Sequence, residues 1–495
     1  MPFERKPRFA TARRKKLHLN PNIDFQHQHR RRFLMHSTRG LGAAALAALM
    51  PGKAQSTQAA DMSDGLHFPA RAKNVIYLFL SGGPAQMDLF DPKPKLQELN
   101  GQEIPRSVVG TQRLTTMTRT QSQFPLAGSQ FRFSSCGESG LELSELLPQL
   151  AKVADRLTMI RSMHTEPINH DPAVTFLQTG SSVTGRPCIG SWVSYGLGTE
   201  NADLPAFIVL LSVGSPGGQP VLSKYWHSGF LPGQHQGSQF RSQGEAVINL
   251  ADPAGISRED RRRIVTAVND LNRLKLEVTC DPEIEARINA FELAFQMQSS
   301  VPDLMDVGGE PKHILEMYGA EPGRASFANN CLLARRLIER GVRFVQLFDK
   351  DWDHHGDLPQ KLRKKTLETD QASAALIRDL EQRGLLDETL VVCGGEFGRT
   401  AYTQGTLSPT NYGRDHHPRC FTVWLAGGGI KPGIVLGKTD DFSYNIVEDP
   451  IHVHDLQATI LHCLGIDHLR LTYRSQGRDF RLTDVNGHVI ERVLA

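Results

Sequence analysis

Residues 389–400, TLVVCGGEFGRT, decide the fold class of this chain. The apolar run from Thr389 to Cys393 leads into two glycines and then the acid Glu396. A continuous apolar run of this length is typical of a strand buried on both faces of a parallel sheet. An acid just after such a strand lies at the carboxyl edge of the sheet, where open α/β folds place their chemistry. The stretch therefore predicts an α/β fold with a functional site at that edge.

The same pattern recurs along the chain. Apolar runs predict strands at residues 74–80, 157–160, 205–211, 342–348, 389–393 and 421–425. Apolar residues at helical spacing predict helices at residues 141–157, 258–278, 283–298, 326–340 and 358–384. Alternating strands and helices indicate a doubly wound, mostly parallel sheet. Long loops and two helices between residues 212 and 300 predict a cap inserted into this domain.

Composition excludes several classes of protein. With 495 residues, of which 39% are apolar and 22% charged, the chain can bury a large core. Residues 1–54 hold 12 of its 56 Lys and Arg residues but 2 of its 53 acids, so the remainder carries a net negative charge. A nucleic-acid-binding protein needs a basic body, so we expect no nucleic-acid partner. The seven cysteines contain no CxxC pair, and we expect no zinc ribbon or catalytic thiol.

The first 54 residues resemble a twin-arginine export signal. RRRFLM at residues 30–35 precedes an apolar run at 41–50 and a small-residue cleavage site near Ala54. A basic disordered arm is the alternative. The apolar run is shorter than the roughly 20 residues of a membrane-spanning helix, and no other segment is a credible span. We expect an exported protein, periplasmic or extracellular, with its main domain at residues 70–495 and no membrane span after signal removal.

Two polar clusters follow predicted strands in the first and middle parts of the domain. SGGPAQMDLFDP at residues 81–92 holds Asp88, a metal-ligand candidate, and Asp91, which precedes a proline and is typical of a turn. DKDWDHHGD at residues 349–357 has four acids and two imidazoles, which repel and desolvate one another if they pack without a counter-ion. This second cluster therefore either holds a cation or forms a solvated acidic loop.

Two more clusters follow later strands. Arg399 lies three residues after Glu396 and can present a planar guanidinium to an oxyanion, although a plain salt bridge between the two is the alternative. RDHHP at residues 414–418 places Asp415 beside His416. Neutral imidazole is the commonest nitrogen ligand of metals, and it needs its other ring nitrogen held by a partner. Several such clusters on one sheet edge predict a metal site.

The order of these motifs resembles the alkaline phosphatase and sulfatase superfamily. A closer resemblance, to the exported family called domain of unknown function 1501, covers residues 70–494. It is carried by LSGGPAQMDLFDPKP at 80–94, WDHH at 352–355, GEFGRT at 395–400, GRDHHP at 413–418, LAGGGIKPG at 425–433 and LTYRSQGRDFRLTDVNG at 471–487. The resemblance implies an alkaline phosphatase-like fold and a metal-dependent hydrolase.

The superfamily's metal ligands carry over to this sequence in part. The positions that match are Asp88, Asp353, His355, Glu396 and His416. Phe397 occupies the position of a paired histidine ligand, so that ligand is missing, and Asp415 or His417 is the expected substitute. The mixed carboxylate and imidazole set implies one or two divalent ions without choosing among zinc, calcium, manganese and magnesium.

The nucleophile position departs from the superfamily. Its sulfatases carry a convertible Cys or Ser where HDPAVTFLQTG, residues 170–180, has His170. Formylglycine chemistry cannot operate there, but an imidazole can act as nucleophile or general base. The alternative is that His170 only begins a helix that Asp171 caps. His164 and Asn169 are the expected substrate-binding neighbours, and Arg399 the expected anion contact.

These observations predict hydrolysis of a phosphate or sulfate ester of a small molecule or glycan. The second hypothesis is a binding protein that has lost turnover, which the departures at His170 and Phe397 favour. Peptide hydrolysis is a third, weaker hypothesis because the HExxH signature is missing.

Overall fold

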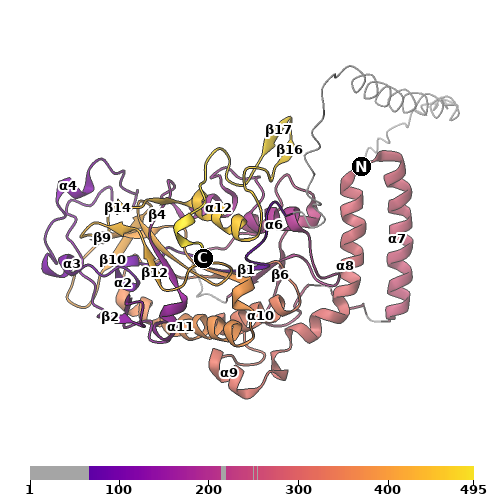
Figure 1. Ribbon diagram of the computed structural model, residues 1–495, viewed down its shortest axis with the longest axis horizontal. Coiled ribbons are helices and arrows are strands. Elements are labelled where there is room, and N and C mark those ends of the chain that lie inside the picture. Colours follow the sequence, from indigo (N-terminus) through magenta and orange to yellow (C-terminus); the bar gives the residue numbers. More distant parts are fainter. Residues whose placement is uncertain (1–65, 213–218, 249, 254) are drawn as a thin grey trace, which may run out of the picture. The chain divides into compact units, whose positions relative to one another are not determined.

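In the part of the chain that the structure describes, a nine-stranded sheet forms the centre of the fold (Figure 1). The structure is a computed structural model that describes residues 66–212, 219–248, 250–253 and 255–495, so the predicted export signal lies outside the described residues. The strands of this sheet are β1 (Asn74–Leu80), β4 (Thr158–His164), β5 (Phe207–Leu211), β6 (Ser238–Phe240), β7 (Phe344–Asp349), β8 (Thr389–Gly394), β11 (Phe421–Ala426), β12 (Ile434–Leu436) and β15 (Ile451–His452).

The sheet is mostly parallel. Its strand order is β12-β4-β11-β8-β1-β7-β5-β6, and β15 pairs with β4. Strands β8, β1, β7, β5 and β6 run parallel to one another. Strand β11 runs antiparallel to both β8 and β4. The predicted α/β fold with a mostly parallel sheet is confirmed.

Helices cover both faces of this sheet, as a doubly wound fold requires. The helices are α5 (His170–Thr179), α6 (Ile189–Leu197), α10 (Phe327–Glu339), α11 (Leu358–Gln382) and α12 (Val453–Cys463). Alternate residues of β1 enter two different cores, because successive side chains of a strand point to opposite faces. Ile76 and Leu78 pack with α10 and α11, whereas Tyr77 and Phe79 pack with α5, α6 and α12. Figure 1 shows α11 and α12 on opposite sides of the sheet.

One predicted helix is wrong. Residues 141–157 form strand β3 (Leu141–Ser144), a turn and a 3₁₀ helix (Leu150–Arg156). Leu141 and Leu143 are buried while Glu142 between them is exposed, which is the alternation of a strand rather than of a helix. The strand pairs with β2 (Phe133–Cys136), and the Asp370 carboxylate accepts hydrogen bonds from the backbone N–H groups at the start of the 3₁₀ helix. These partners lie outside residues 141–157, so the leucine spacing within the segment predicted a helix that the rest of the fold does not allow.

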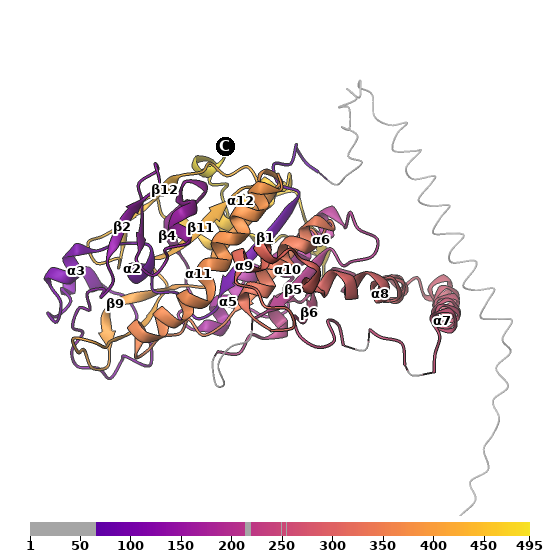
Figure 2. The ribbon, with the colours of Figure 1, turned by 90° about the horizontal axis from the view of Figure 1, so that it is seen from below.

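The region expected to form a cap contains a helical hairpin. Helices α7 (Arg258–Thr279) and α8 (Pro282–Met305) pack along each other, and α8 also contacts α10. Figure 2 shows α7 on the side of α8 that faces away from the sheet. Whether this region works as a cap stays a prediction. Among the described residues, no helix is both long enough and apolar enough to cross a membrane.

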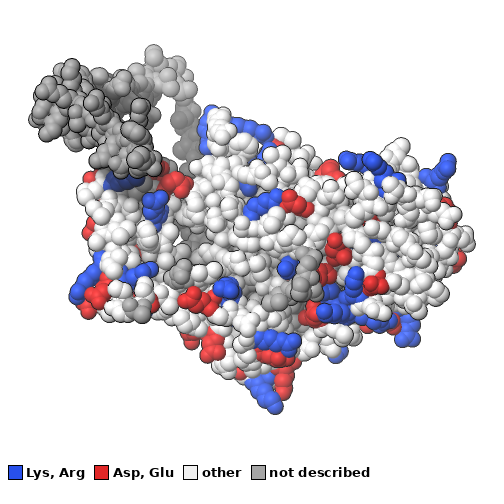
Figure 3. All heavy atoms as spheres, turned by 180° about the vertical axis from the view of Figure 1, so that it is seen from behind, with Lys and Arg blue, Asp and Glu red and all other residues white. Residues whose placement is uncertain are grey.

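Acidic and basic side chains are mixed on the surface of the protein seen in Figure 3. Exposed ion pairs such as Arg263 with Glu259 and Arg324 with Glu321 contribute to this mixture. A nucleic-acid-binding face carries clustered Lys and Arg instead. The view shows one face only, so the absence of a nucleic-acid partner stays a prediction.

Candidate metal centre

Three imidazoles and one carboxylate meet at the carboxyl edge of the sheet. They belong to His170, Asp353, His355 and His416, whose potential ligand atoms all lie within 4.8 Å of one another. His170 is the first residue of α5, and Asp353 and His355 lie in the loop after β7. His416 lies in β10 (Gly413–His417), which pairs with β9 (Gly398–Gln404) just beyond the end of β8. The parallel strands β7 and β8 flank β1, so the segments that follow them meet at one edge.

Asp353 lies at the centre of this cluster. Its Oδ1 is 2.7 Å from Nε2 of His355 and 3.4 Å from Nε2 of His416. Its Oδ2 is 3.2 Å from Nε2 of His170. Burial raises the pKa of Asp353, but the three imidazoles and the Arg399 guanidinium outweigh burial and hold that pKa well below its ordinary value. Asp353 is therefore ionised near pH 7.

Two imidazole nitrogens face each other in the cluster. Nδ1 of His416 donates to the backbone carbonyl of Ile168 at 2.8 Å, and Nδ1 of His355 hydrogen-bonds the side-chain oxygen of Gln404. In the neutral rings these bonds leave both Nε2 atoms as lone-pair acceptors, only 3.1 Å apart. Burial lowers the pKa of His416 to about 4, so this ring stays neutral near pH 7. Two facing lone pairs beside an anion repel one another unless a proton or a metal ion lies between them.

The spacing of these donor atoms suits a small divalent ion. Bonds of about 2.0–2.2 Å to zinc put tetrahedral donor atoms roughly 3.3–3.6 Å apart. The His416 Nε2 atom lies 3.4 Å from Asp353 Oδ1 and 3.1 Å from His355 Nε2, close to that spacing. The 2.7 Å between His355 Nε2 and Asp353 Oδ1 would widen around an ion. The residues present therefore fit a metal ion.

His170 supplies the third imidazole. Its Nδ1 donates to Oε1 of Glu396 at 2.6 Å, and its Nε2 is buried without a hydrogen-bond partner in the described part of the chain. The 3.2 Å separation between this Nε2 and Asp353 allows attraction, but the atoms are too poorly aligned for a hydrogen bond. Burial lowers the pKa of His170, yet the carboxylates of Asp353 and Glu396 outweigh burial and raise it. A buried, unpartnered nitrogen beside the cluster is a further potential ligand.

Glu396 orients His170. It is not one of the four residues whose potential ligand atoms face one another, which we call the donor set. Its carboxylate also accepts the backbone N–H of Gly82, at 3.0 Å and 3.2 Å to its two oxygens. Gly82 has φ +121°, and a Cβ there would meet the backbone nitrogen of Asp353 at 2.5 Å. Only glycine allows both this conformation and this approach. The glycine turn thus fixes Glu396 and, through it, the ring of His170.

We expect Glu396→Gln to weaken metal binding about 10–100-fold while the donor atoms stay in place, because metal-ligating histidines depend on such outer partners. Metal titration followed by calorimetry measures the affinity. Glu310→Gln, at a buried carboxylate that pairs with Arg335, is the matched control and should bind metal as the wild type does. Unchanged metal affinity in Glu396→Gln would contradict the orienting role.

Arg399 is buried and anchors Asp353. Its Nη2 donates to Oδ1 of Asp353 at 2.6 Å and also to the carbonyl of Gly82. Its Nε donates to the carbonyl of Gly83 at 2.8 Å and its Nη1 to the carbonyl of Arg414 at 3.0 Å. These bonds use four of the five guanidinium N–H groups. Arg399 therefore holds the candidate ligand Asp353. It has only one N–H group left to contact an anionic substrate, the role that the sequence predicted.

Asp88 and Asp415, both predicted metal ligands, lie outside the cluster. The Asp88 carboxylate is buried and accepts from Nε of Arg414 and from the Tyr412 hydroxyl, each at 2.7 Å. The Asp415 carboxylate accepts the backbone N–H of His416 at 2.8 Å and the hydroxyl of Thr118 at 2.6 Å. Asp88 is thus a buried ion-pair partner, and Asp415 braces the strand that carries His416.

Sequence analysis did not identify the groups that fix the tautomers of His355 and His416. Gln404 and the carbonyl of Ile168 hold Nδ1 of His355 and of His416. Neither group stands in a motif. Gln404 ends a strand 49 residues after His355, and Ile168 contributes only its backbone. No local signal could have pointed to them.

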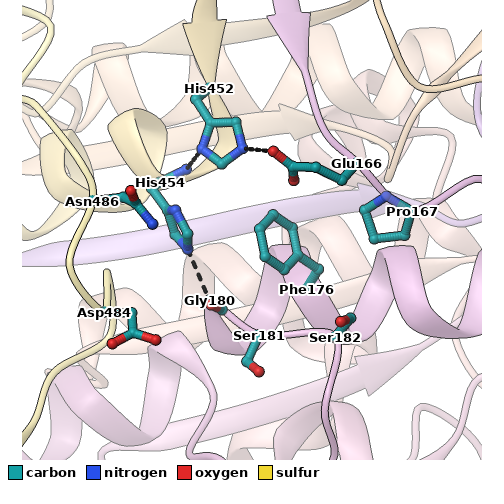
Figure 4. Close-up of a pocket in the computed structure, with 10 residues that line it drawn as sticks. All are labelled: Glu166, Pro167, Phe176, Gly180, Ser181, Ser182, His452, His454, Asp484 and Asn486. Atoms are coloured by element: carbon teal, nitrogen blue, oxygen red, sulfur yellow. Dashed lines mark hydrogen bonds and ion pairs between the residues drawn. The ribbon is translucent and has the colours of Figure 1, made fainter.

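Asn169 and His164, predicted to bind substrate, have different surroundings. Asn169 is exposed and precedes α5 without capping it through its side chain. The ring of His164 lies 5.0 Å from that of His452. His452 in turn lines a separate pocket of about 510 Å³ (Figure 4). The structure therefore places neither residue in the donor set.

This pocket is rich in hydrogen-bond acceptors. It is lined by Glu166, Pro167, Phe176, Gly180, Ser181, Ser182, His452, His454, Asp484 and Asn486. Nε2 of His454 donates to the carbonyl of Gly180 at 3.0 Å, which leaves Nδ1 as a buried acceptor without a partner among the described residues. Figure 4 shows the Phe176 ring beside His452 and His454, with Glu166 at the rim. A ligand here must donate hydrogen bonds and tolerate an aromatic wall.

Comparisons with solved structures return distant matches. The protein crystallised as Ps i-CgsB in complex with k-i-k-neocarrahexaose is 11% identical, with a TM-score of 0.34 over 80% of this chain and 72% of that chain. A phosphonate monoester hydrolase from Silicibacter pomeroyi is 11% identical, with a TM-score of 0.33 over 85% and 76%. The PsFucS1 sulfatase from Pseudoalteromonas sp. is 13% identical, with a TM-score of 0.33 over 80% and 68%.

These TM-scores are low, so we base no argument about the reaction on them. No curated protein matches the chain. The family described as "Protein of unknown function (DUF1501)" matches residues 72–494, almost the whole described part of the chain. The predicted resemblance to this family is confirmed, and the protein belongs to it.

Proposed function

We propose that this protein is an exported metal-dependent hydrolase of phosphate or sulfate esters. The observation that carries the proposal is the pair of facing Nε2 atoms of His355 and His416, 3.1 Å apart beside the anionic Asp353. A divalent ion held by these residues and His170 would stabilise the negative charge that develops on the ester oxygens. Three imidazoles with one carboxylate favour zinc over calcium, magnesium and manganese.

The chain's own residues hold the donor atoms in place. Asp353 is fixed by Arg399, and the rings of His355 and His416 are held through their Nδ1 atoms. His170 has Nδ1 on Glu396, and its unpartnered Nε2 faces the cluster, where it would ligate the ion. We therefore propose His170 as a ligand rather than as the nucleophile. Such preorganised groups need not rearrange when the ester reacts.

The alcohol part of the ester would lie in the acceptor-rich pocket of Figure 4. The segment of residues 166–170 joins the two places, because Glu166 lines the pocket while His170 enters the cluster. Nδ1 of His454 is an acceptor without a partner, and the hydroxyls of Ser181 and Ser182 can accept and donate hydrogen bonds, which suits the hydroxyls of a sugar-like alcohol. The proposed substrate class is thus a phosphate or sulfate ester of a polyhydroxylated molecule.

The pocket assignment makes a kinetic prediction. Phe176→Ala should raise KM for a sugar phosphate or sugar sulfate about 3- to 10-fold with a smaller change in kcat, because it removes an aromatic contact away from the reacting atoms. Steady-state kinetics of phosphate or sulfate release measure both constants. Phe291→Ala, on the distant helix α8, is the aromatic control and should change neither. A fall in kcat of about 3- to 10-fold with no change in KM would show that this pocket does not bind the alcohol part of the ester.

A second candidate function is a binding protein without turnover. The observation that favours it is Arg399, because its guanidinium is almost fully used by carbonyls and Asp353. A hydrolase of anionic esters commonly presents a cationic group to the transferring oxygens. In this alternative the cluster binds a metal and an anionic ligand but does not promote cleavage.

One experiment separates the two candidates. The full-length protein is exported, purified and analysed for metal, and nitrophenyl phosphate, a phosphodiester and nitrophenyl sulfate are tested for turnover. The hydrolase proposal expects one or two bound ions and turnover that a chelator abolishes and the metal restores. Bound metal without turnover of any ester would support the binding protein, and absence of bound metal would refute both.

A further inference from the structure

A glutamine from outside the donor set reaches Asp353. Nε2 of Gln219 lies 3.4 Å from Oδ2 of Asp353. A carboxylate only accepts hydrogen bonds, so the amide nitrogen of Gln219, and not its amide oxygen, must face Asp353. This long contact uses one of the two N–H groups of the amide. The second N–H makes no hydrogen bond to any residue that the structure describes, so it can donate to a ligand.

Solvent reaches the donor set on the side of Asp353 and His355. The side chains of these two residues are 17% and 26% exposed, whereas those of His170 and His416 are 10% and 4% exposed. Gln219 contacts Asp353 and is itself half-buried. Its amide therefore lies beside the opening through which a ligand must approach the donor set.

The segment that carries Gln219 is fixed to the start of helix α5. Nζ of Lys224 pairs with the Asp171 carboxylate at 2.6 Å. The hydroxyl of Tyr225 donates to the same carboxylate at 2.9 Å, and the Tyr225 side chain is buried. Asp171 directly follows His170, so this segment is held by the same turn of α5 that supplies a candidate ligand. Gln219 is thus positioned with respect to the donor set.

We infer that Gln219 donates its second N–H to an anionic oxygen of the phosphate or sulfate group, an inference that rests on the proposed ester hydrolase. Arg399 has one N–H group left for this oxygen, and Asp171 neutralises Lys224. A neutral amide donates to an anion without adding a positive charge that would repel the metal ion. Hydrogen bonds to charged acceptors are also roughly twice as strong as those between neutral groups.

Calorimetric titration of the zinc-loaded protein with inorganic phosphate and with sulfate tests this contact. Gln219→Leu keeps the approximate size of the side chain but removes both N–H groups. Because a hydrogen bond to a charged group is lost, it should weaken binding of the preferred anion about 10- to 100-fold and change zinc affinity by less than about 3-fold. Gln219→Glu, which brings a negative charge to the same place, should weaken anion binding at least as much. Gln239→Leu, at an exposed glutamine of strand β6, is the matched control and should bind zinc and anion as the wild type does.

Three results would overturn the role of Gln219. They are a zinc-loaded wild type that binds neither anion, an anion affinity that Gln219→Leu leaves unchanged, and a loss of zinc affinity in Gln219→Leu as large as the loss of anion affinity. The last result would make Gln219 a support of the metal site instead. Anion binding is measured without turnover, so a protein that binds phosphate through Gln219 but cleaves no ester would refute the hydrolase and still support this contact.

Discussion

Replacing His355 with alanine is expected to weaken metal binding by at least about 100-fold, more than the loss of an outer partner such as Glu396 typically costs. The variant removes one of the two facing Nε2 atoms and leaves Asp353 and His416 in place. Metal content after dialysis and calorimetric titration measure the loss. His355 is half-buried and lies in the loop after β7. The fold of the variant should therefore persist, which circular dichroism checks.

The matched control is the neighbouring histidine. The ring of His354 hydrogen-bonds the carbonyl of Asp351 at 2.9 Å and lies outside the donor set. His354→Asn should therefore keep its metal and any turnover, after correction for stability because this residue is buried. Equal metal loss in both variants would show that the loop after β7 is merely disturbed. Full metal content in His355→Ala would refute the proposed centre.

Replacing Asp88 with asparagine should lower the free energy of unfolding by about 3–5 kcal/mol. The buried guanidinium of Arg414, which donates to Asp88 at 2.7 Å, would lose its counter-charge. In the wild type the carboxylate of Asp88 raises the pKa of Arg414 against the lowering effect of burial. A guanidinium stays charged in proteins even without such a partner, so the variant would bury an unpaired charge. Denaturant unfolding followed by tryptophan fluorescence and by circular dichroism measures the loss.

This variant also separates the two roles considered for Asp88. If it is only an ion-pair partner, Asp88→Asn should retain wild-type metal stoichiometry despite its lower stability. If it is a metal ligand, as its sequence position suggested, the stoichiometry should fall at temperatures well below unfolding. Asp387→Asn, at an exposed aspartate, is the control and should change neither property.

Local sequence was sufficient for the strands that build the sheet. The runs at residues 74–80 and 389–393 are apolar after their first residue, and both became central strands that are buried along their whole length. The glycines and acids that follow these strands correctly indicated the edge of the sheet at which the candidate site lies. Asp353, His355, His416 and His170 were each singled out in the sequence, and the structure brings all four together. Local patterns succeed here because burial and turn formation are properties of adjacent residues.

Partners far apart in the chain were decided only by tertiary structure. Asp88 and Arg414 are 326 residues apart, and no local pattern states that they pair. The carboxylate of Glu396 points to His170, 226 residues away, and thus orients a ring instead of joining the donor set. Strand β11 runs antiparallel although its sequence is as apolar as that of β8. A sequence pattern reports which side chains must leave water, but packing alone selects the groups that satisfy their charges and hydrogen bonds.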